Sequence, residues 1–346
     1  MLTLFAGAMC GAQTSQWTYK DCVNYARQNN ISLQKIRLNE QTTAYNLEEA
    51  QAQWHPALDF ATTQGYANYP WGESAKNTYS SSYSLNAGWT VWNGGLRENN
   101  IKRNELQQKI SQLATGDAIR TLETDLLQVY VNILYARESI GIYEEAVKLS
   151  EAQAHRAKQL WDAGRLSKVD YAQLKSQYEQ DRYALVEAKG VYDTRRMELK
   201  RLLELGIDTD IEPADVEWTA EQVLAALPPI DESYKLAVIN DLQLQSLDLE
   251  KDGSELDINI AKASGKPTIA LNAGVGTGYN APGIGFGSAL RQSFGENIGL
   301  TLSVPILDNK KTRTAVAKAK IQRMDAELDI NQRQTDLAQL VENWYI

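Results

Sequence analysis

Residues 122–161 decide the fold, and they read LETDLLQVYVNILYARESIGIYEEAVKLSEAQAHRAKQLW. Apolar and small side chains recur here in alternating steps of four and three, the spacing of a coiled-coil seam. The seam positions are Leu122, Leu126, Val129, Ile133, Ala136, Ile140, Tyr143, Val147, Ser150, Ala154, Ala157 and Trp161. No proline interrupts residues 93–163, so we expect one helix there, which at about 1.5 Å per residue is roughly 105 Å long.

A second seam follows in residues 165–204, at Tyr171, Leu174, Tyr178, Asp181, Leu185, Ala188, Tyr192, Arg195, Leu199 and Leu202. Gly164 separates the two seams, and glycine is the usual residue just past a helix C-terminus. The sequence therefore predicts a long helical hairpin made of helices 93–163 and 165–204. Taken alone, this stretch is also typical of a cytosolic coiled-coil protein.

The residues before the hairpin predict a helix and two strands. Residues 17–54 have helical periodicity, with a break indicated at Asn29-Asn30 and an end enforced by Pro56. Apolar and polar residues then alternate with period two, which predicts strands at 57–69 and 79–92. Strands of this length, tilted by about 45°, are long enough to cross the hydrocarbon core of a bilayer.

The same order of elements then occurs a second time. Ala26, Leu33, Ala50 and Pro56 have counterparts at constant spacing, namely Ala237, Leu244, Ala261 and Pro267. We therefore expect a first repeat at 17–204, a linker at 205–230 and a second repeat at 231–346. The second repeat should contain a helix at 231–264, strands at 267–279 and 297–307, and the start of a long helix at 308–346. A complete second copy needs roughly 70 further residues, so we expect the chain to be a fragment.

Composition excludes several classes of protein. The formal charge of −9 argues against a nucleic-acid partner, and two His and two Cys leave little material for a metal site or a disulfide framework. No nucleophile–base constellation occurs, so we expect neither an enzyme nor a cofactor. Residues 1–12 resemble the apolar part of a secretory signal whose positive n-region is missing, and lipidation of Cys10 stays open.

Four strands in one chain predict an assembly. They cannot close a barrel, and an open edge in lipid leaves backbone groups without partners. We therefore expect three copies to contribute twelve strands to one barrel, a size known for outer-membrane barrels, and the long helices to pack into a second, helical tube. The residues expected to face lipid are Tyr79, Tyr83, Leu85, Trp89, Val91, Ile298, Leu300 and Leu302.

An ordered set of local features carries a family resemblance. It comprises the duplication, the Ala50-to-Pro56 and Ala261-to-Pro267 steps, the strand exits at residues 92–95 (WNGG) and 304–308 (VPILD), and the hairpin turn at 163–170 (AGRLSKVD). Together these resemble the TolC-type outer-membrane efflux and secretion duct family. The resemblance implies a homotrimer in the Gram-negative outer membrane that extends into the periplasm and docks onto a membrane-fusion adaptor and an inner-membrane pump.

The resemblance also implies roles for the hairpin turn. Gly164, Arg165, Leu166, Ser167, Lys168 and Val169 match the periplasmic tip that contacts the adaptor or pump, and Asp170 matches an aspartate that helps hold the closed aperture. An ordinary hairpin closure with Ser167 as helix N-cap explains the same residues. The implied function is the passive exit duct of a tripartite efflux pump or type I secretion system. The alternative, a soluble periplasmic coiled-coil adaptor or scaffold, predicts polar residues on both strand faces.

Overall fold

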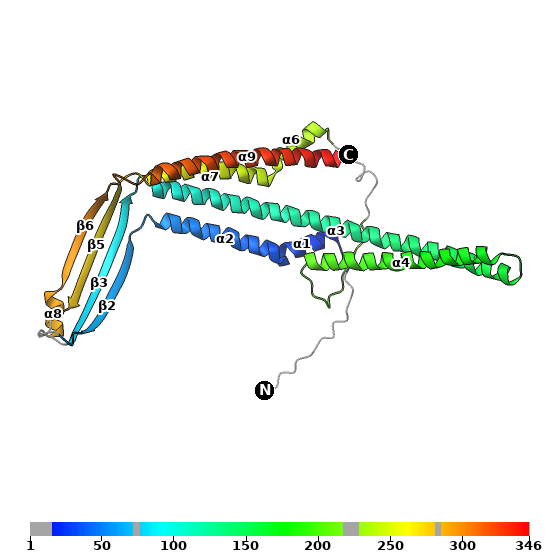
Figure 1. The fold of residues 1–346 in the computed structure, drawn as a ribbon, viewed down its shortest axis with the longest axis horizontal. Helices are drawn as coiled ribbons and strands as arrows, with labels where there is room; N and C mark the ends of the chain where they lie inside the picture. Colours follow the sequence, from blue (N-terminus) through cyan, green and yellow to red (C-terminus); the bar gives the residue numbers. More distant parts are fainter. Residues whose placement is uncertain (1–15, 72–76, 217–227, 281–284, 346) are drawn as a thin grey trace. The chain divides into compact units, whose positions relative to one another are not determined.

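The computed structural model describes residues 16–71, 77–216, 228–280 and 285–345. All elements except the two-residue strands β1 and β4 are labelled in Figure 1. In chain order they are β1 (Gln16–Trp17), α1 (Tyr19–Asn29), α2 (Ile31–Ala52), β2 (Ala57–Asn68), β3 (Asn77–Trp92), α3 (Leu96–Asp162), α4 (Lys168–Leu202), β4 (Glu212–Pro213), α6 (Ile230–Asn240), α7 (Leu242–Ala263), β5 (Thr268–Tyr279), α8 (Phe286–Gln292), β6 (Gly295–Ser303) and α9 (Lys311–Tyr345). The expected signal segment 1–12, with Cys10, lies outside the described residues.

The chain forms two compact units, and α2 and α3 run through both. One unit comprises Met1–Leu38 and Thr115–Pro228, and the other comprises Asn39–Ala114 and Pro229–Ile346. We call them the hairpin unit and the sheet unit. No helix in the described part of the chain is long and apolar enough to span a membrane.

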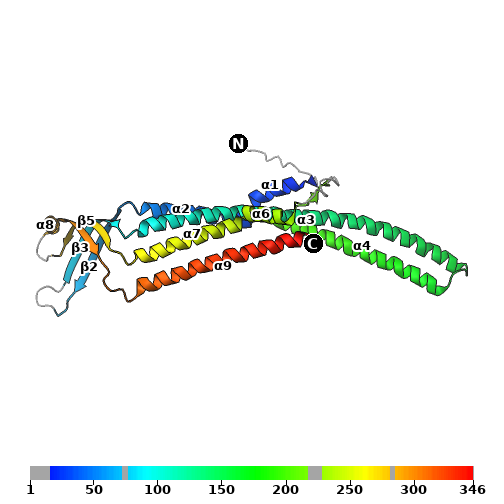
Figure 2. The ribbon, with the colours of Figure 1, turned by 90° about the horizontal axis from the view of Figure 1, so that it is seen from above.

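The sheet unit is built on one antiparallel sheet with the order β2-β3-β5-β6 (Figure 1). The four expected strands are present. The prediction that the last strand extends to residue 307 is wrong, because β6 ends at Ser303. Pro305 follows two residues later, and proline has no N–H with which to continue a ladder. Beyond the strands, α7 and α9 lie side by side in both views (Figures 1 and 2).

Both repeats make the same turn from strand to helix. Gly94 and Gly95 have φ angles of 71° and 88°, and their counterparts Asn309 and Lys310 have φ angles of 51° and 67°. In the first repeat, Asn93 then accepts a hydrogen bond from the backbone of Arg97 at 3.1 Å. The counterpart Asp308 accepts one from the backbone of Thr312 at 2.8 Å. The left-handed turn is therefore duplicated even where glycine is not.

The helix breaks are duplicated as well. Asn30 separates α1 from α2 and accepts a hydrogen bond from the Leu33 N–H at 3.0 Å. Asp241 separates α6 from α7 and accepts one from the Leu244 N–H at 2.6 Å. The prediction of one continuous helix over 231–264 is therefore wrong, because the Asp241 side chain starts a new helix in the way that N-cap residues do.

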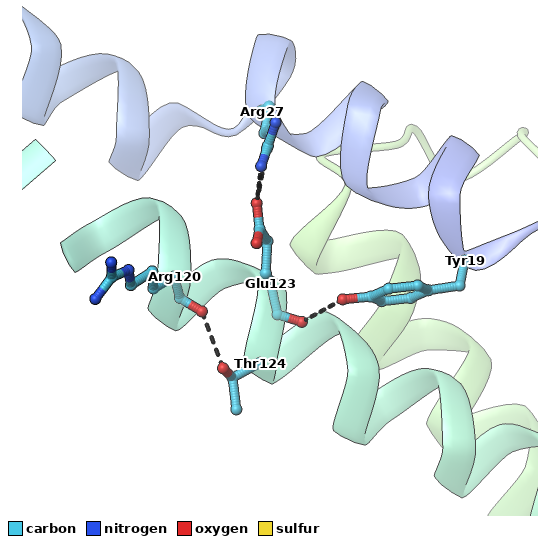
Figure 3. Close-up of polar contacts among 5 residues, drawn as sticks. All are labelled: Tyr19, Arg27, Arg120, Glu123 and Thr124. Carbon is cyan, nitrogen blue, oxygen red and sulfur yellow. Dashed lines mark hydrogen bonds and ion pairs between the residues drawn. The ribbon is translucent and has the colours of Figure 1, made fainter. Parts of the chain in front are cut away.

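In the hairpin unit, α1 packs against α3 and α4 around a small core. The fully buried members are Cys22, Ala26, Leu126, Tyr130, Leu199, Leu203 and Ile211, each 0% exposed. Polar contacts flank this core, and Figure 3 shows Glu123 of α3 accepting from Arg27 through its carboxylate and from the Tyr19 hydroxyl through its backbone carbonyl, at 3.0 Å. At the next residue, the Thr124 hydroxyl donates to the Arg120 carbonyl, one helical turn before it, at 3.0 Å (Figure 3).

A short parallel strand pair closes the hairpin unit, and sequence periodicity did not indicate it. Gln16 pairs with Glu212 and Trp17 with Pro213, so Trp17 lies in a strand and not in the predicted helix. The Tyr130 hydroxyl is a donor to the Trp17 carbonyl of β1 at 3.0 Å and to the carbonyl of Ala214, just past β4, at 2.7 Å. Burial raises the pKa of Tyr130 to about 12, so it stays a neutral hydrogen-bond donor.

Candidate functional site

The sheet register collects the large apolar side chains of all four strands on one face. Directly opposite residues in a sheet point to the same side. Leu85 lies opposite Phe60 and Val275, and Trp89 lies opposite Leu271, which in turn lies opposite Leu300. We call this the apolar face; its main members are Leu58, Phe60, Tyr66, Tyr79, Tyr83, Leu85, Trp89, Ile269, Leu271, Val275, Tyr279, Ile298, Leu300 and Leu302.

Much of the apolar face is uncovered. Phe60 is 66% exposed, Ile298 77% and Leu300 68%. A continuous apolar surface of this kind marks contact with a membrane or a partner. Seven of the eight residues expected to face lipid lie on this face, whereas Val91 lies at a register shift between Thr90 and Trp92 and has no partner on β5.

A short helix that the sequence did not indicate packs on the apolar face near the β5–β6 connection. The ring of Phe286 in α8 lies 5.6 Å from that of Tyr279, which lies 6.1 Å from that of Tyr79. The Thr277 hydroxyl donates to the Leu290 carbonyl at 2.5 Å. The sequence predicted no element between the strands at 267–279 and 297–307, and the contacts to β5 stabilise a helix of seven residues there.

The opposite side of the sheet, which we call the polar face, carries only small side chains. Its paired positions hold Gly, Ala, Ser and Thr, with Asp59, Asn86, Asn272 and Asn297 as the largest members. Asp59 is the only ionisable side chain among the paired positions of this face. The apolar face has one carboxylate, Glu296, opposite Val275. The two faces therefore differ in both size and polarity.

In the hairpin unit, the candidate tip is a well-defined helix–turn–helix connection. The N–H of Gly164 donates to the Trp161 carbonyl at 2.9 Å, and that of Arg165 to the Leu160 carbonyl at 2.8 Å. This pair of bonds is a Schellman motif, which requires a left-handed residue after the helix; Gly164 supplies it with φ of 68°. The structure thus brings Gly164, Arg165 and Leu166 into one compact turn.

The second helix of the hairpin starts at an N-cap. The Ser167 hydroxyl oxygen accepts from the Asp170 N–H at 3.1 Å, and its O–H donates to the Asp170 carboxylate at 2.7 Å. This is the ordinary hairpin closure that the sequence left open, and it engages the Asp170 carboxylate in a local contact. The same carboxylate is exposed, so it keeps further acceptor capacity.

The surface of the tip is part apolar. Val169 is 74% exposed. Behind it, the rings of Trp161 and Tyr171 stack with centroids 5.1 Å apart and planes 5° from parallel. Sequence analysis placed both rings on seams but missed that they form one pair across the hairpin, which holds the turn between two rigid helices.

A further residue that sequence analysis missed is Arg97 at the strand-to-helix junction of the sheet unit. It is 2% exposed, and its guanidinium donates to the carbonyls of Gln53, Thr90 and Val91 at 3.1, 2.7 and 3.2 Å. Its Cζ lies 3.6 Å from the centre of the Trp54 ring. Arg97 thus ties the ends of α2 and β3 together, and a lone arginine in a helix gives no sequence signal for this role.

Within the described residues, no cluster of three His, Cys, Asp or Glu side chains is arranged to hold a metal ion. Cys22 is the free cysteine in the described part, and burial raises its pKa to about 12. A thiol of this kind is unreactive, since the thiolate is the nucleophile.

This arrangement of a two-faced four-stranded sheet with long helices is the fold of several solved outer-membrane proteins. A structure of CusC is similar with a TM-score of 0.81 and 17% identity, over 98% of this chain and 78% of that one. The CmeC outer membrane channel of Campylobacter jejuni is similar with a TM-score of 0.77 and 16% identity, over 92% of this chain and 68% of that one. The outer membrane protein VceC of Vibrio cholerae is similar with a TM-score of 0.74 and 13% identity, over 92% of this chain and 75% of that one. No curated protein matches the sequence.

Residues 22–204 match the family described as outer membrane efflux protein, and the chain belongs to this family. It is accordingly an exit duct for an efflux pump, situated in the Gram-negative outer membrane and extending into the periplasm. Family membership confirms the resemblance drawn from the repeats, the strand exits and the turn. It does not favour the soluble adaptor or scaffold alternative.

Proposed function

We propose that three copies of the chain close into one passive duct, with the apolar face toward lipid and the polar face lining a water-filled lumen. The observation that carries this proposal is the sheet register, which gives a four-stranded sheet one exposed apolar face and one small polar face. The edge strands β2 and β6 have no partner in the described sheet. Three sheets joined edge to edge give the backbone N–H and C=O groups of both edge strands hydrogen-bond partners, and they give a barrel of twelve strands.

The hairpin tip is proposed as the docking surface for a periplasmic membrane-fusion adaptor and an inner-membrane pump. Residues 164–169 present a rigid turn with the exposed Val169, and Asp170 follows them at the aperture. Docking supplies the energy-coupled partners, while the duct itself conducts without chemistry of its own. The same architecture serves type I secretion if the inner-membrane partner is a secretion pump.

The mass of the detergent-extracted complex tests the assembly. Light scattering on the outer-membrane fraction should give three times the mass of one chain. A monomer or dimer recovered from the soluble periplasm contradicts the proposal and leaves the soluble scaffold.

Site-specific cross-linking tests docking. Val169→Cys, modified with a photo-activated cross-linker in the native cells, should give an adduct that mass spectrometry identifies as a periplasmic adaptor or pump component. Tyr183→Cys is the control, since this α4 residue is 69% exposed but lies several turns from the tip. Equal adduct yields at the two positions argue against the tip as the docking surface.

A further inference from the structure

One row across the polar face combines the only ionisable side chain among the paired positions of that face with two amides. Asp59 of β2 lies opposite Asn86 of β3, which lies opposite Gly274 of β5, which lies opposite Asn297 of β6. All four positions therefore project to the same side at the same level of the sheet. The row crosses the whole width of the sheet without interruption.

Contacts within the row orient its polar groups. The Asn86 side-chain amide donates to the Asp59 carboxylate at 3.3 Å and to the Ser84 hydroxyl at 3.2 Å. A Cβ on Gly274 would lie 3.0 Å from the Asn297 side-chain oxygen and 3.1 Å from that of Asn86. Both amide oxygens therefore extend over the glycine, which leaves room for them. The row presents a carboxylate and two amide oxygens, all of them hydrogen-bond acceptors.

The neighbouring rows of the polar face carry no charge. The row on the helix side contains Ala57, Gly88, Asn272 and Gly299, and the row on the other side contains Ala61, Ser84, Gly276 and Gly295. With no ionisable group in either row to oppose it, the field of Asp59 dominates this level of the polar face. Small side chains on both sides leave the carboxylate accessible to water and ions.

We infer that this row forms a cation-preferring ring inside the duct. The inference rests on the proposed function, since it needs the polar face to line the lumen of a trimer. The threefold axis places the three Asp59 carboxylates at one level, and each is the first member of a row with two asparagine side chains. A ring of carboxylates raises the local concentration of inorganic and organic cations and repels anions, which is how acidic rings give pores their selectivity.

The reversal potential of the purified complex in a planar bilayer under a KCl gradient tests this inference. At about 0.1 M salt, D59N should lower the K⁺/Cl⁻ permeability ratio by about threefold, and the difference should fade near 1 M as the Debye length falls from about 10 Å to about 3 Å. E296Q is the matched control. It removes the same charge from the same part of the sheet, but from the apolar face, and should leave the ratio unchanged.

The possible outcomes separate the ring from the duct. An unchanged ratio in D59N, or an equal change in E296Q, contradicts the ring and leaves the duct intact. A trimer with no conductance contradicts the lumen assignment itself, and the ring with it. A ratio that falls in D59N alone, with the expected dependence on salt, supports the ring.

Discussion

Replacing Arg97 with methionine should destabilise the sheet unit more than any other single change at its strand-to-helix junctions. The variant loses three charge-assisted hydrogen bonds to the carbonyls of Gln53, Thr90 and Val91 and the contact with the Trp54 ring. Hydrogen bonds involving a charged group contribute about 1.5–3 kcal/mol each, and a desolvated cation–π contact about 2 kcal/mol. Methionine retains part of the packing and water solvates part of the freed backbone, so we expect a net loss of about 3–5 kcal/mol.

The free energy of unfolding in urea, followed by tryptophan fluorescence in detergent, measures this loss. The chain offers its own control, because Thr312 occupies the equivalent place at the start of α9 and makes no comparable set of contacts. Thr312→Ala should cost less than about 1 kcal/mol. A double-mutant cycle with Trp54→Leu should give a coupling energy of about 1–2 kcal/mol between Arg97 and the ring.

Two results would refute the reasoning. A loss below 1 kcal/mol for Arg97→Met, or one equal to that of Thr312→Ala, would mean that water replaces the guanidinium at no cost. Strict additivity of the Trp54 and Arg97 substitutions would show that the ring contact contributes nothing.

Three further outcomes follow from the hairpin unit. Gly164→Ala should lower the stability by about 1 kcal/mol, because the φ angle of Gly164 is positive. Gly190→Ala, in the middle of α4, should raise the stability by about 1 kcal/mol. Thermal midpoints that shift in the same direction in both variants contradict this prediction. Tyr130→Phe removes the hydroxyl that bridges the Trp17 and Ala214 carbonyls, of which the Trp17 carbonyl still accepts the Ala214 N–H, and should cost about 1–3 kcal/mol, measured in urea. Burial raises the pKa of Cys22 from 9.0 to about 12, so the contribution of its neutral thiol to stability is complete below pH 9 and is lost as the pH rises toward 12. Cys22→Ala should reduce this loss of stability at alkaline pH. A denaturation profile that is the same for both proteins between pH 8 and 12 excludes a contribution from Cys22.

The repeats and the two-faced strands could be predicted because their periodicity is local. Leu85 and Trp89 share a face through the pleat alone, and the register only adds their partners. Pro56 and Gly164 end their helices through their own backbone chemistry. For these features the sequence contains the physical cause within a few residues.

The features that could not be predicted depend on contacts between residues far apart in the chain. The strand at Trp17 forms only because residues 212–213 lie beside it, and α8 forms where Tyr279 and Thr277 of β5 provide contacts. The helix break at Asp241 could have been predicted from the duplication, since Asn30 occupies the matching place in the first repeat. Arg97 could not be found, because neither its burial nor its carbonyl partners follow from helical spacing.

The two strand-to-helix junctions share a backbone turn but not their side chains. Trp54 and Arg97 in the first repeat correspond to Gly265 and Thr312 in the second, where a Cβ on the glycine would come within 2.9 Å of the threonine. In the proposed trimer, joints with a tryptophan–arginine pair therefore alternate around the circumference with joints that have a glycine–threonine pair. The backbone of such a ring approaches sixfold symmetry, but its surface chemistry at this level has only a threefold axis. A partner that recognises these joints by their side chains has three equivalent sites available to it, and not six.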